Sequence, residues 1–325
     1  MTARWRFQVP GVFTGSFLFV VGDRGVLQVH EESHLAMVAL SLDDGQIVWR
    51  RPFEYDTVEI FFPFESRLFL DGLQARSLNS ADGGTVAEKD WGERVTVRPP
   101  IRNGPVYWLE ESGIIMGLDP ATLDELWRWP DPEGACLVHD DVLCSYERHG
   151  VIEVVDFRTG VRLHRCQGPR REKGSLTRGI WNHLLIQTYE RRRVAIDVRT
   201  GGVVWDHSEE DDGMRYLMQF AEGVAYAGGT RLSACDLGTG NMIWRQDFSP
   251  YSSALGCIPV VRGGYIYGGT RNGLVFVVNA ATGEVESSFQ VPHAVNAVAP
   301  APGGLVVVGS SELIECHPWP PRPLG

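Results

Sequence analysis

The sequence predicts an all-β fold built from one four-stranded unit used repeatedly, and two observations carry that prediction. The phrase Asp-x-x-Thr-Gly-x-x-x-Trp recurs about every forty residues, and its full copies are Asp197–Trp205 and Asp236–Trp244. The residues between copies are short apolar runs separated by Gly- and Asn-bearing turns, which is the pattern of β-hairpins. A period of this length indicates a supersecondary unit that buries its apolar face only against its neighbours.

Weaker copies of the phrase mark the other repeats. Each keeps part of it, and they start at Ser41, Asn79, Asp119, Asp156 and Asn279. The glycine that follows threonine supplies a positive φ in a tight turn, where a Cβ would be costly. The tryptophan has the area to cover the boundary with the next unit.

The segment from Ala254 to Val291 is the clearest single repeat. It predicts four strands, at Leu255–Val261, Tyr265–Tyr267, Leu274–Asn279 and Glu284–Val291. Three turns joining four strands make an antiparallel meander, which is the blade of a β-propeller.

The two ends of the chain complete the count of blades. After Val291 only three apolar runs remain, and the Pro-rich tail 318–325 cannot donate a ladder strand. The missing strand is predicted at Arg4–Val9, with Trp5 in the place of Trp205. We therefore expect an eight-bladed β-propeller of four-stranded antiparallel blades, closed by the N-terminal strand, with residues 1–325 as a single domain and a monomeric ring.

The longer phrase Ala-x-Asp-x-x-Thr-Gly-x-x-x-Trp, at Ala195–Trp205 and Ala234–Trp244, resembles the tryptophan-docking motif of the PQQ-like β-propellers. That family includes quinoprotein alcohol dehydrogenases and the lipoprotein of the outer-membrane β-barrel assembly machine. The resemblance implies the fold and not an activity, because docking residues hold blades together. Quinoprotein dehydrogenases carry a disulfide between adjacent cysteines beside the cofactor, and this sequence has no Cys-Cys pair. We expect no cofactor.

The net charge and the hydropathy of the chain limit the kinds of partner and the cellular location that we expect. The formal net charge of -11 argues against a nucleic-acid partner or an anionic membrane. The apolar stretch Val12–Val21 is too short to span a bilayer, and Gly22-Asp23-Arg24 offers no signal-peptidase site. The expectation is a cytoplasmic protein, unlike the best-known family members, which are periplasmic.

The cysteines show neither a CxxC pair nor a metal spacing. Several lie in apolar strand runs, as buried thiols do. Cys136 and Cys144 fall on adjacent strands of one predicted hairpin, so a disulfide between them is an alternative to two free thiols.

One segment, His30-Glu31-Glu32-Ser33-His34, matches the HExxH motif of zinc proteases. That motif works on a helix, which places both His on one face with the Glu as base. The flanking runs predict strands, with Leu35 starting the third strand of its repeat. The motif is therefore expected on a hairpin turn, with metal binding by His30 and His34 left as a weak alternative.

Other catalytic signatures are absent from the sequence. It contains no Gly-x-Ser-x-Gly elbow, no Walker loop and no Rossmann glycine fingerprint. No catalytic residue can be named.

Basic side chains gather on one class of predicted turn. In a propeller, the turns between second and third strands open on the same face as the loops between blades, and that face collects a set that we call the basic arc. Because Arg binds carboxylate and phosphate bidentately, the basic arc is a candidate dock for an acidic protein or a phosphorylated ligand. It comprises Arg148, His149, Arg170, Arg171, Lys173, Arg191, Arg192, Arg231 and Arg271, with Arg193 beside them.

The resulting functional prediction is a non-catalytic scaffold or adaptor that binds another protein through one loop face, with an acidic partner as one option. The acidic run Glu209–Asp212 lies in a neighbouring loop. Two alternatives stay open. One is an enzyme, either a stripped quinoprotein-type oxidoreductase or a metal-assisted hydrolase using His30 and His34. The other is an immunity-type protein that neutralises a cognate effector.

Overall fold

The computed structural model describes the greater part of the chain. The described residues are 2–9, 18–31, 34–53, 61–97, 106–109, 113–129, 134–139, 142–147, 149–170, 176–189, 192–208, 217–228, 231–248, 255–257, 259–301, 303–310 and 313–319. Their regular structure consists of β-strands, which confirms the predicted all-β class. None of them forms a helix long and apolar enough to cross a membrane.

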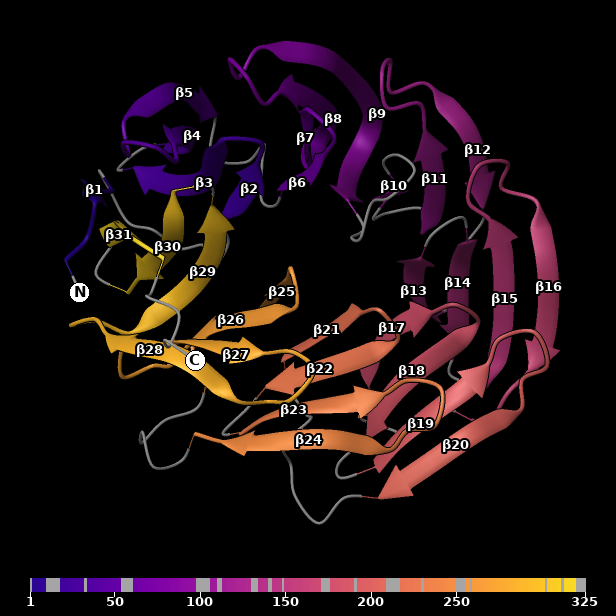
Figure 1. The fold of residues 1–325 in the computed structure, drawn as a ribbon. Helices are drawn as coiled ribbons and strands as arrows, with labels where there is room; N and C mark the ends of the chain where they lie inside the picture. Colours follow the sequence, from indigo (N-terminus) through magenta and orange to yellow (C-terminus); the bar gives the residue numbers. More distant parts are fainter. Residues whose placement is uncertain are drawn as a thin grey trace. The chain divides into compact units, whose positions relative to one another are not determined.

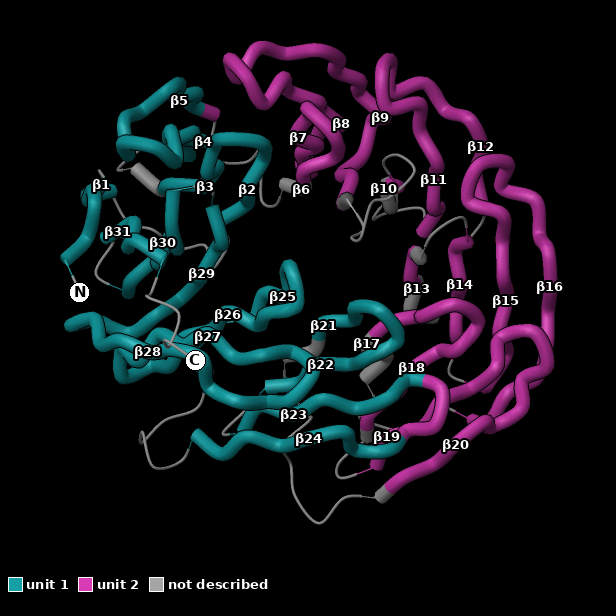
Figure 2. Tube along the Cα trace, viewed as in Figure 1, with its two compact units in different colours: residues 1–52, 210–237, 241–325 teal, residues 53–209, 238–240 magenta. Residues whose placement is uncertain are grey.

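The chain divides into two compact units, which Figure 2 distinguishes by colour. Unit 1 comprises Met1–Pro52, Glu210–Leu237 and Asn241–Gly325. Unit 2 comprises Phe53–Glu209 and Gly238–Gly240.

Unit 1 contains four sheets of four strands each. The first consists of β2 (Phe19–Val21), β3 (Arg24–Glu31), β4 (His34–Ser41) and β5 (Ile47–Phe53). The second consists of β21 (Leu217–Ala221), β22 (Val224–Gly228), β23 (Arg231–Asp236) and β24 (Met242–Asp247). The third consists of β25 (Val260–Arg262), β26 (Tyr265–Gly269), β27 (Leu274–Asn279) and β28 (Val285–Gln290). The fourth consists of β29 (Val295–Ala301), β30 (Gly304–Gly309), β31 (Leu313–His317) and β1 (Trp5–Gln8).

The first and last strands of the chain, β1 and β31, lie side by side in this fourth sheet, as Figure 1 shows. β1 pairs antiparallel with β31 in a register that places Trp5 opposite Cys316 and Gln8 opposite Leu313. The Trp5 side chain is buried, and its Nε1 donates a hydrogen bond to the carbonyl of Leu42 at 3.1 Å. The predicted completion of the last blade by the N-terminal strand is confirmed.

Unit 2 contains one sheet of seven strands and two sheets of four. The seven-stranded sheet consists of β6 (Phe61–Phe64), β7 (Arg67–Leu70), β8 (Gly72–Asn79), β9 (Thr85–Val97), β10 (Val106–Leu109), β11 (Ile114–Leu118) and β12 (Glu125–Trp129). The next consists of β13 (Gly134–His139), β14 (Val142–Glu147), β15 (Val151–Asp156) and β16 (Arg162–Gln167). The last consists of β17 (Leu176–Trp181), β18 (Leu184–Tyr189), β19 (Arg192–Asp197) and β20 (Val203–Ser208).

The predicted number of eight blades is wrong, because the described residues form seven sheets. The cause lies in β9, which pairs with β8 along one part and with β10 along another. Eight separate blades would require the chain to leave the sheet between the outer strand of the second repeat and the first strand of the third. Instead β9 continues through Gly92, at a φ of 76°, and joins the two repeats into one seven-stranded sheet (Figure 1). The described residues therefore make seven blades of a β-propeller rather than eight.

The repeated phrase acts at the boundary between neighbouring sheets, which we call a seam. Trp127 of β12 donates from its indole Nε1 to the carbonyl of Phe157 at 2.7 Å, in the next sheet. A Cβ on Gly160 would lie 2.6 Å from the Trp127 side chain, so the glycine provides the room for the indole. The pairs Trp244 with Gly283 and Trp5 with Gly45 have the same close approach. Threonine-glycine and tryptophan are therefore two halves of one contact, contributed by adjacent repeats.

One contact of this kind, between the two repeats that share the seven-stranded sheet, exchanges these roles. Leu123, at a φ of 61°, occupies the place of the glycine, and it is fully buried. Ala87, opposite Ser77, occupies the place of the tryptophan, and it packs in the cluster that contains Leu123. The side chain that is smaller in one repeat is matched by a larger side chain in the other.

Candidate binding surface

The turn between β14 and β15 in unit 2 carries the first member of the basic arc, His149, whose side chain is exposed. Two hydrogen bonds hold the turn: Gln167 Nε2 donates to the carbonyl of His149 at 2.9 Å, and Gly168 N donates to that of Gly150 at 2.8 Å. Gly150 has a φ of 93°, which a residue with a Cβ rarely adopts. The backbone under His149 is therefore fixed by the neighbouring strand end.

The same strand end leads directly to Arg170. The Tyr146 hydroxyl donates to the carbonyl of Pro169, and Arg170 follows it with an exposed side chain. Figure 1 shows β14 and β16, from which the two segments extend, in the same sheet. The structure thus brings His149 and Arg170 together around one anchored corner.

Arg192 lies at the start of β19, in the next sheet of unit 2. Core side chains of the two sheets, among them Tyr146 and Ile196, form one buried cluster, so the sheets are neighbours. Arg192 Nε donates to Asp206 Oδ1 at 2.7 Å, and this hydrogen bond lowers the pKa of the Asp206 carboxyl below its ordinary value. Arg192 is exposed and retains an intramolecular partner, whereas Arg193 is buried.

Two further members of the basic arc belong to unit 1. Arg231 pairs with Asp247, with Nε and Oδ2 3.4 Å apart. Arg271 is exposed on the turn between β26 and β27. That turn is held like the one at His149: Gln290 Nε2 donates to the carbonyl of Asn272, and Val291 N donates to that of Gly273 at 2.9 Å.

The remaining members of the predicted surface lie outside the described residues. They are Arg148, Arg171, Lys173, Arg191 and the acidic run Glu209–Asp212.

The HExxH segment lies on a hairpin, as the sequence predicts. β3 and β4 pair antiparallel, with His30 opposite Leu35 and Glu31 opposite His34. Two imidazoles of an HExxH zinc site require successive turns of a helix, and a hairpin offers none. His34 Nε2 lies 3.2 Å from Arg50 Nη2. Within the described part of the chain, no group of three or more His, Cys, Asp or Glu side chains is placed to hold a metal ion.

The alternative of a disulfide between Cys136 and Cys144 is wrong. Cys144 stands opposite Leu137, and Cys136 stands opposite Ser145. The two cysteines are therefore offset by one residue and do not face each other across the hairpin. Cys144 is buried and is not part of a disulfide.

A seam that the sequence analysis missed lies between β16 and the turn after β19. His164 pairs with Val154 as Trp205 pairs with Ala195, so a histidine stands where a docking tryptophan is expected. The thiol of Cys166 donates to the carbonyl of Val198 at 3.1 Å. That carbonyl corresponds to the one that receives the indole hydrogen bond in the tryptophan seams. Counting four residues on from Gly160 would have revealed the exchange.

The charges around this seam explain why the Cys166 thiol is protonated. Asp197 accepts a hydrogen bond from Arg199 Nη2 at 2.7 Å, which lowers the pKa of the carboxyl to about 2, and His183 Nε2 lies 3.7 Å away. Burial, together with the Asp197 charge, raises the pKa of the Cys166 thiol. Cys166 therefore stays protonated near neutral pH and serves as a hydrogen-bond donor rather than a nucleophile.

Solved structures share this fold at low sequence identity. BamB from Moraxella catarrhalis is 15% identical, with a TM-score of 0.60 over 95% of this chain and 96% of that one. The computationally designed Ika8 protein is 13% identical, with a TM-score of 0.71 over 97% and 99%. Chaetomium thermophilum Sqt1, bound to the N-terminus of the ribosomal protein L10, is 10% identical, with a TM-score of 0.67 over 97% and 99%. No curated protein matches the sequence significantly.

A family model gives the assignment that these structures alone do not. The model described as outer membrane protein assembly factor BamB matches residues 71–219 and 228–314, well over half of the chain. Those residues include both full copies of the docking phrase and most of the sheets described above. The chain therefore belongs to the PQQ-like β-propeller family of the outer membrane protein assembly factor BamB.

Proposed function

We propose that the protein is a non-catalytic scaffold that binds another protein, and that His149, Arg170 and Arg192 of unit 2 contact an acidic segment of that partner. The carrying observation is the anchored corner: His149 and Arg170 are exposed while the backbone beneath them is held by hydrogen bonds from Gln167 and Tyr146. A surface whose backbone is fixed before binding loses little conformational entropy when the partner arrives.

The comparisons support a role in protein binding. The matching family is described as an assembly factor, and Sqt1 is seen with the N-terminus of a ribosomal protein. Neither description names a catalytic activity. Among the described residues, the lowered pKa values of Asp197 and Asp206 each have an arginine hydrogen bond as their main cause, which is typical of structural ion pairs.

The contact between these basic side chains and carboxylates of the partner should respond to charge and salt. Arg192 already shares its charge with Asp206, so Arg170 is the stronger candidate for a carboxylate of the partner. A contact of this kind at a solvated rim acts mainly on the association rate, and it weakens with added salt.

Affinity capture with the full chain from its native host tests the proposal. Arg170→Glu is expected to reduce capture of the wild-type partner by roughly tenfold at low salt, as reversal of a contact charge does. Arg158→Glu is the matched control, because it makes the same charge change on a turn between third and fourth strands of the same sheet. Its capture should equal that of the wild type, and Arg170→Glu should not change the melting temperature appreciably.

The outcomes separate the two parts of the proposal. Equal loss of capture in both variants would refute the assignment of the contact to Arg170. A wild-type chain that captures no protein stoichiometrically would refute the scaffold itself.

A further inference from the structure

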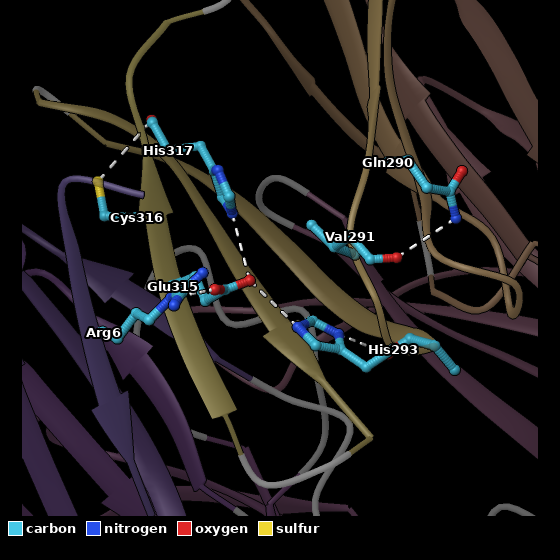
Figure 3. A network of polar contacts seen from close by, with 8 residues as sticks. Arg6, Gln290, Val291, His293, Glu315, Cys316 and His317 are labelled. Carbon is cyan, nitrogen blue, oxygen red and sulfur yellow. Dashed lines mark hydrogen bonds and ion pairs between the residues drawn. The ribbon is translucent and has the colours of Figure 1, made fainter. Parts of the chain in front are cut away.

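A buried carboxylate in the last sheet receives three side chains from three segments (Figure 3). Glu315 of β31 has a side chain that is only 1% exposed. Arg6 Nε donates to its Oε1 at 2.7 Å. His293 Nε2 and His317 Nε2 lie 3.1 and 3.3 Å from its Oε2. Both ring contacts are hydrogen bonds when each imidazole carries its proton on Nε2.

The arginine in this cluster belongs to the strand that closes the sheet. Arg6 stands directly opposite Glu315 in the register of β1 and β31, and Arg4 N donates to the carbonyl of Cys316 at 2.7 Å. β1 reaches this sheet from the other end of the chain, so only non-covalent contacts hold it there. Among these contacts, the ion pair of Arg6 joins its exposed guanidinium to the buried carboxylate of Glu315. Removing one partner of such a pair is costly, because the other charge remains buried.

The cluster has little space for rearrangement. The His317 ring packs against Phe289 with centroids 4.7 Å apart, and its Nδ1 is buried without a partner. A Cβ on Gly309 would lie 2.2 Å from His293 Nδ1, so the second ring is closely confined as well. A proton added to His317 Nδ1 would find no acceptor there.

The described part of the chain shows which other charged groups lie near the cluster. β30 presents Val307 opposite Glu315, which adds no charge. Arg4 and Asp43 act on the neighbouring Cys316. Arg6, His293 and His317 are therefore the groups that set the charge balance around Glu315.

Both perturbed groups weaken the fold when acid is added. Burial lowers the pKa of His317 below its ordinary value, so the unfolded chain takes up a proton first and stability falls as the pH drops below about 6.5. For Glu315 burial raises the pKa, but the hydrogen bonds from His293, Arg6 and His317 outweigh it, so the pKa is lowered. Its stabilisation is present above the ordinary carboxyl value and is lost as the pH falls through the folded pKa.

We propose that Arg6, His293, Glu315 and His317 form a pH-sensitive latch that holds the N-terminal strand β1 on β31 near neutral pH and releases it in acid. The latch is local. Unpairing β1 leaves the other three strands of the sheet joined by their own hydrogen bonds.

Hydrogen exchange of the N-terminal peptide in the full chain, expressed as a protection factor at each pH, tests the latch. The protection factor of β1 in the wild type is expected to fall when the pH is lowered from 7 to 4. The protection factor of the peptide covering β15 should not change. Glu315→Gln should reduce β1 protection at pH 7 by roughly tenfold or more, as loss of a charged hydrogen bond predicts, and should abolish the loss below pH 5 while keeping the loss that His317 causes below about pH 6.5. His317→Gln keeps a donor without a titrating ring, so its protection should be flat down to pH 5 and fall only below.

Two controls keep the result interpretable. Glu153 and Arg165 form the equivalent pair between third and outer strands in unit 2, 3.4 Å apart and without histidine, so Glu153→Gln should leave β1 protection unchanged. Arg6→Gln changes a side chain that is 63% exposed and serves if Glu315→Gln fails to fold. Protection of β1 that is independent of pH in the wild type overturns the proposal. So does an equal effect of Glu315→Gln and Glu153→Gln.

Discussion

Two seams of unit 2 carry the same turn phrase and close in different ways. At the first, the indole of Trp127 fills the gap to the next sheet, donates to Phe157 and lies where a Cβ of Gly160 would be. At the second, His164 replaces the tryptophan, and a Cβ on Gly201 would lie 2.2 Å from the carbonyl oxygen of Gln167.

The difference shows what the glycine is for. In both seams it has a positive φ, of 68° at Gly160 and 74° at Gly201, so the turn alone accounts for part of its presence. The rest depends on the neighbour. Gly160 makes room for an aromatic ring, whereas Gly201 lets two backbones approach directly, with the hydrogen bond to the carbonyl now supplied by the Cys166 thiol.

The largest expected effect comes from emptying the tryptophan seam. Trp127→Ala should lower the free energy of unfolding by about 3–5 kcal/mol, because it removes a buried ring and leaves the Phe157 carbonyl without its donor. His164→Ala should cost about 1 kcal/mol or less, since the ring is half-buried and its Nε2 has no hydrogen-bond partner among the described residues. Urea unfolding measures both. Equal losses would contradict the distinction between the seams.

The second effect comes from restoring the phrase where the structure has abandoned it. His164→Trp rebuilds the consensus, yet the gap is already filled by the backbone around Gln167. We expect a loss of about 1–3 kcal/mol from overpacking rather than a gain. A stabilised variant, measured by the same urea transition, would show that the second seam has room for an indole.

The smallest effect concerns the thiol donor. Cys166→Val keeps much of the volume but leaves the Val198 carbonyl without the donor, so it should cost about 1 kcal/mol. Cys166→Ser retains a donor and should stay within about 0.5 kcal/mol of the wild type. If the two variants have equal unfolding free energies, the thiol contributes packing alone.

Much of the fold follows from local pattern. The hairpins, the place of Trp5 on the closing strand and the hairpin position of His30 and His34 were predictable, because alternation and turn residues act within one repeat. The blade count was not. Whether Trp91 and Gly92 end one strand or continue it depends on pairing with β8 and β10, which no local pattern records.

The binding surface shows the same limit. The sequence places His149 and Arg170 on exposed turns by counting strands, and the structure puts both at one corner. The sequence does not reveal that Arg192 already has Asp206 as a partner, or that Arg193 is buried. Those facts depend on the direction in which each side chain points, because neighbouring residues on a strand point to opposite faces of the sheet.

The sequence by itself determined the repeat, its strand order, its docking residues and the closure of the last sheet by the first residues. Each is encoded by short-range pattern, and periodicity repeats that pattern until it is unmistakable. Only the tertiary structure decided how the seam without tryptophan closes, where two repeats merge into one sheet, and that Glu315 gathers Arg6, His293 and His317. These features arise between residues far apart in the chain, where packing and desolvation select the outcome.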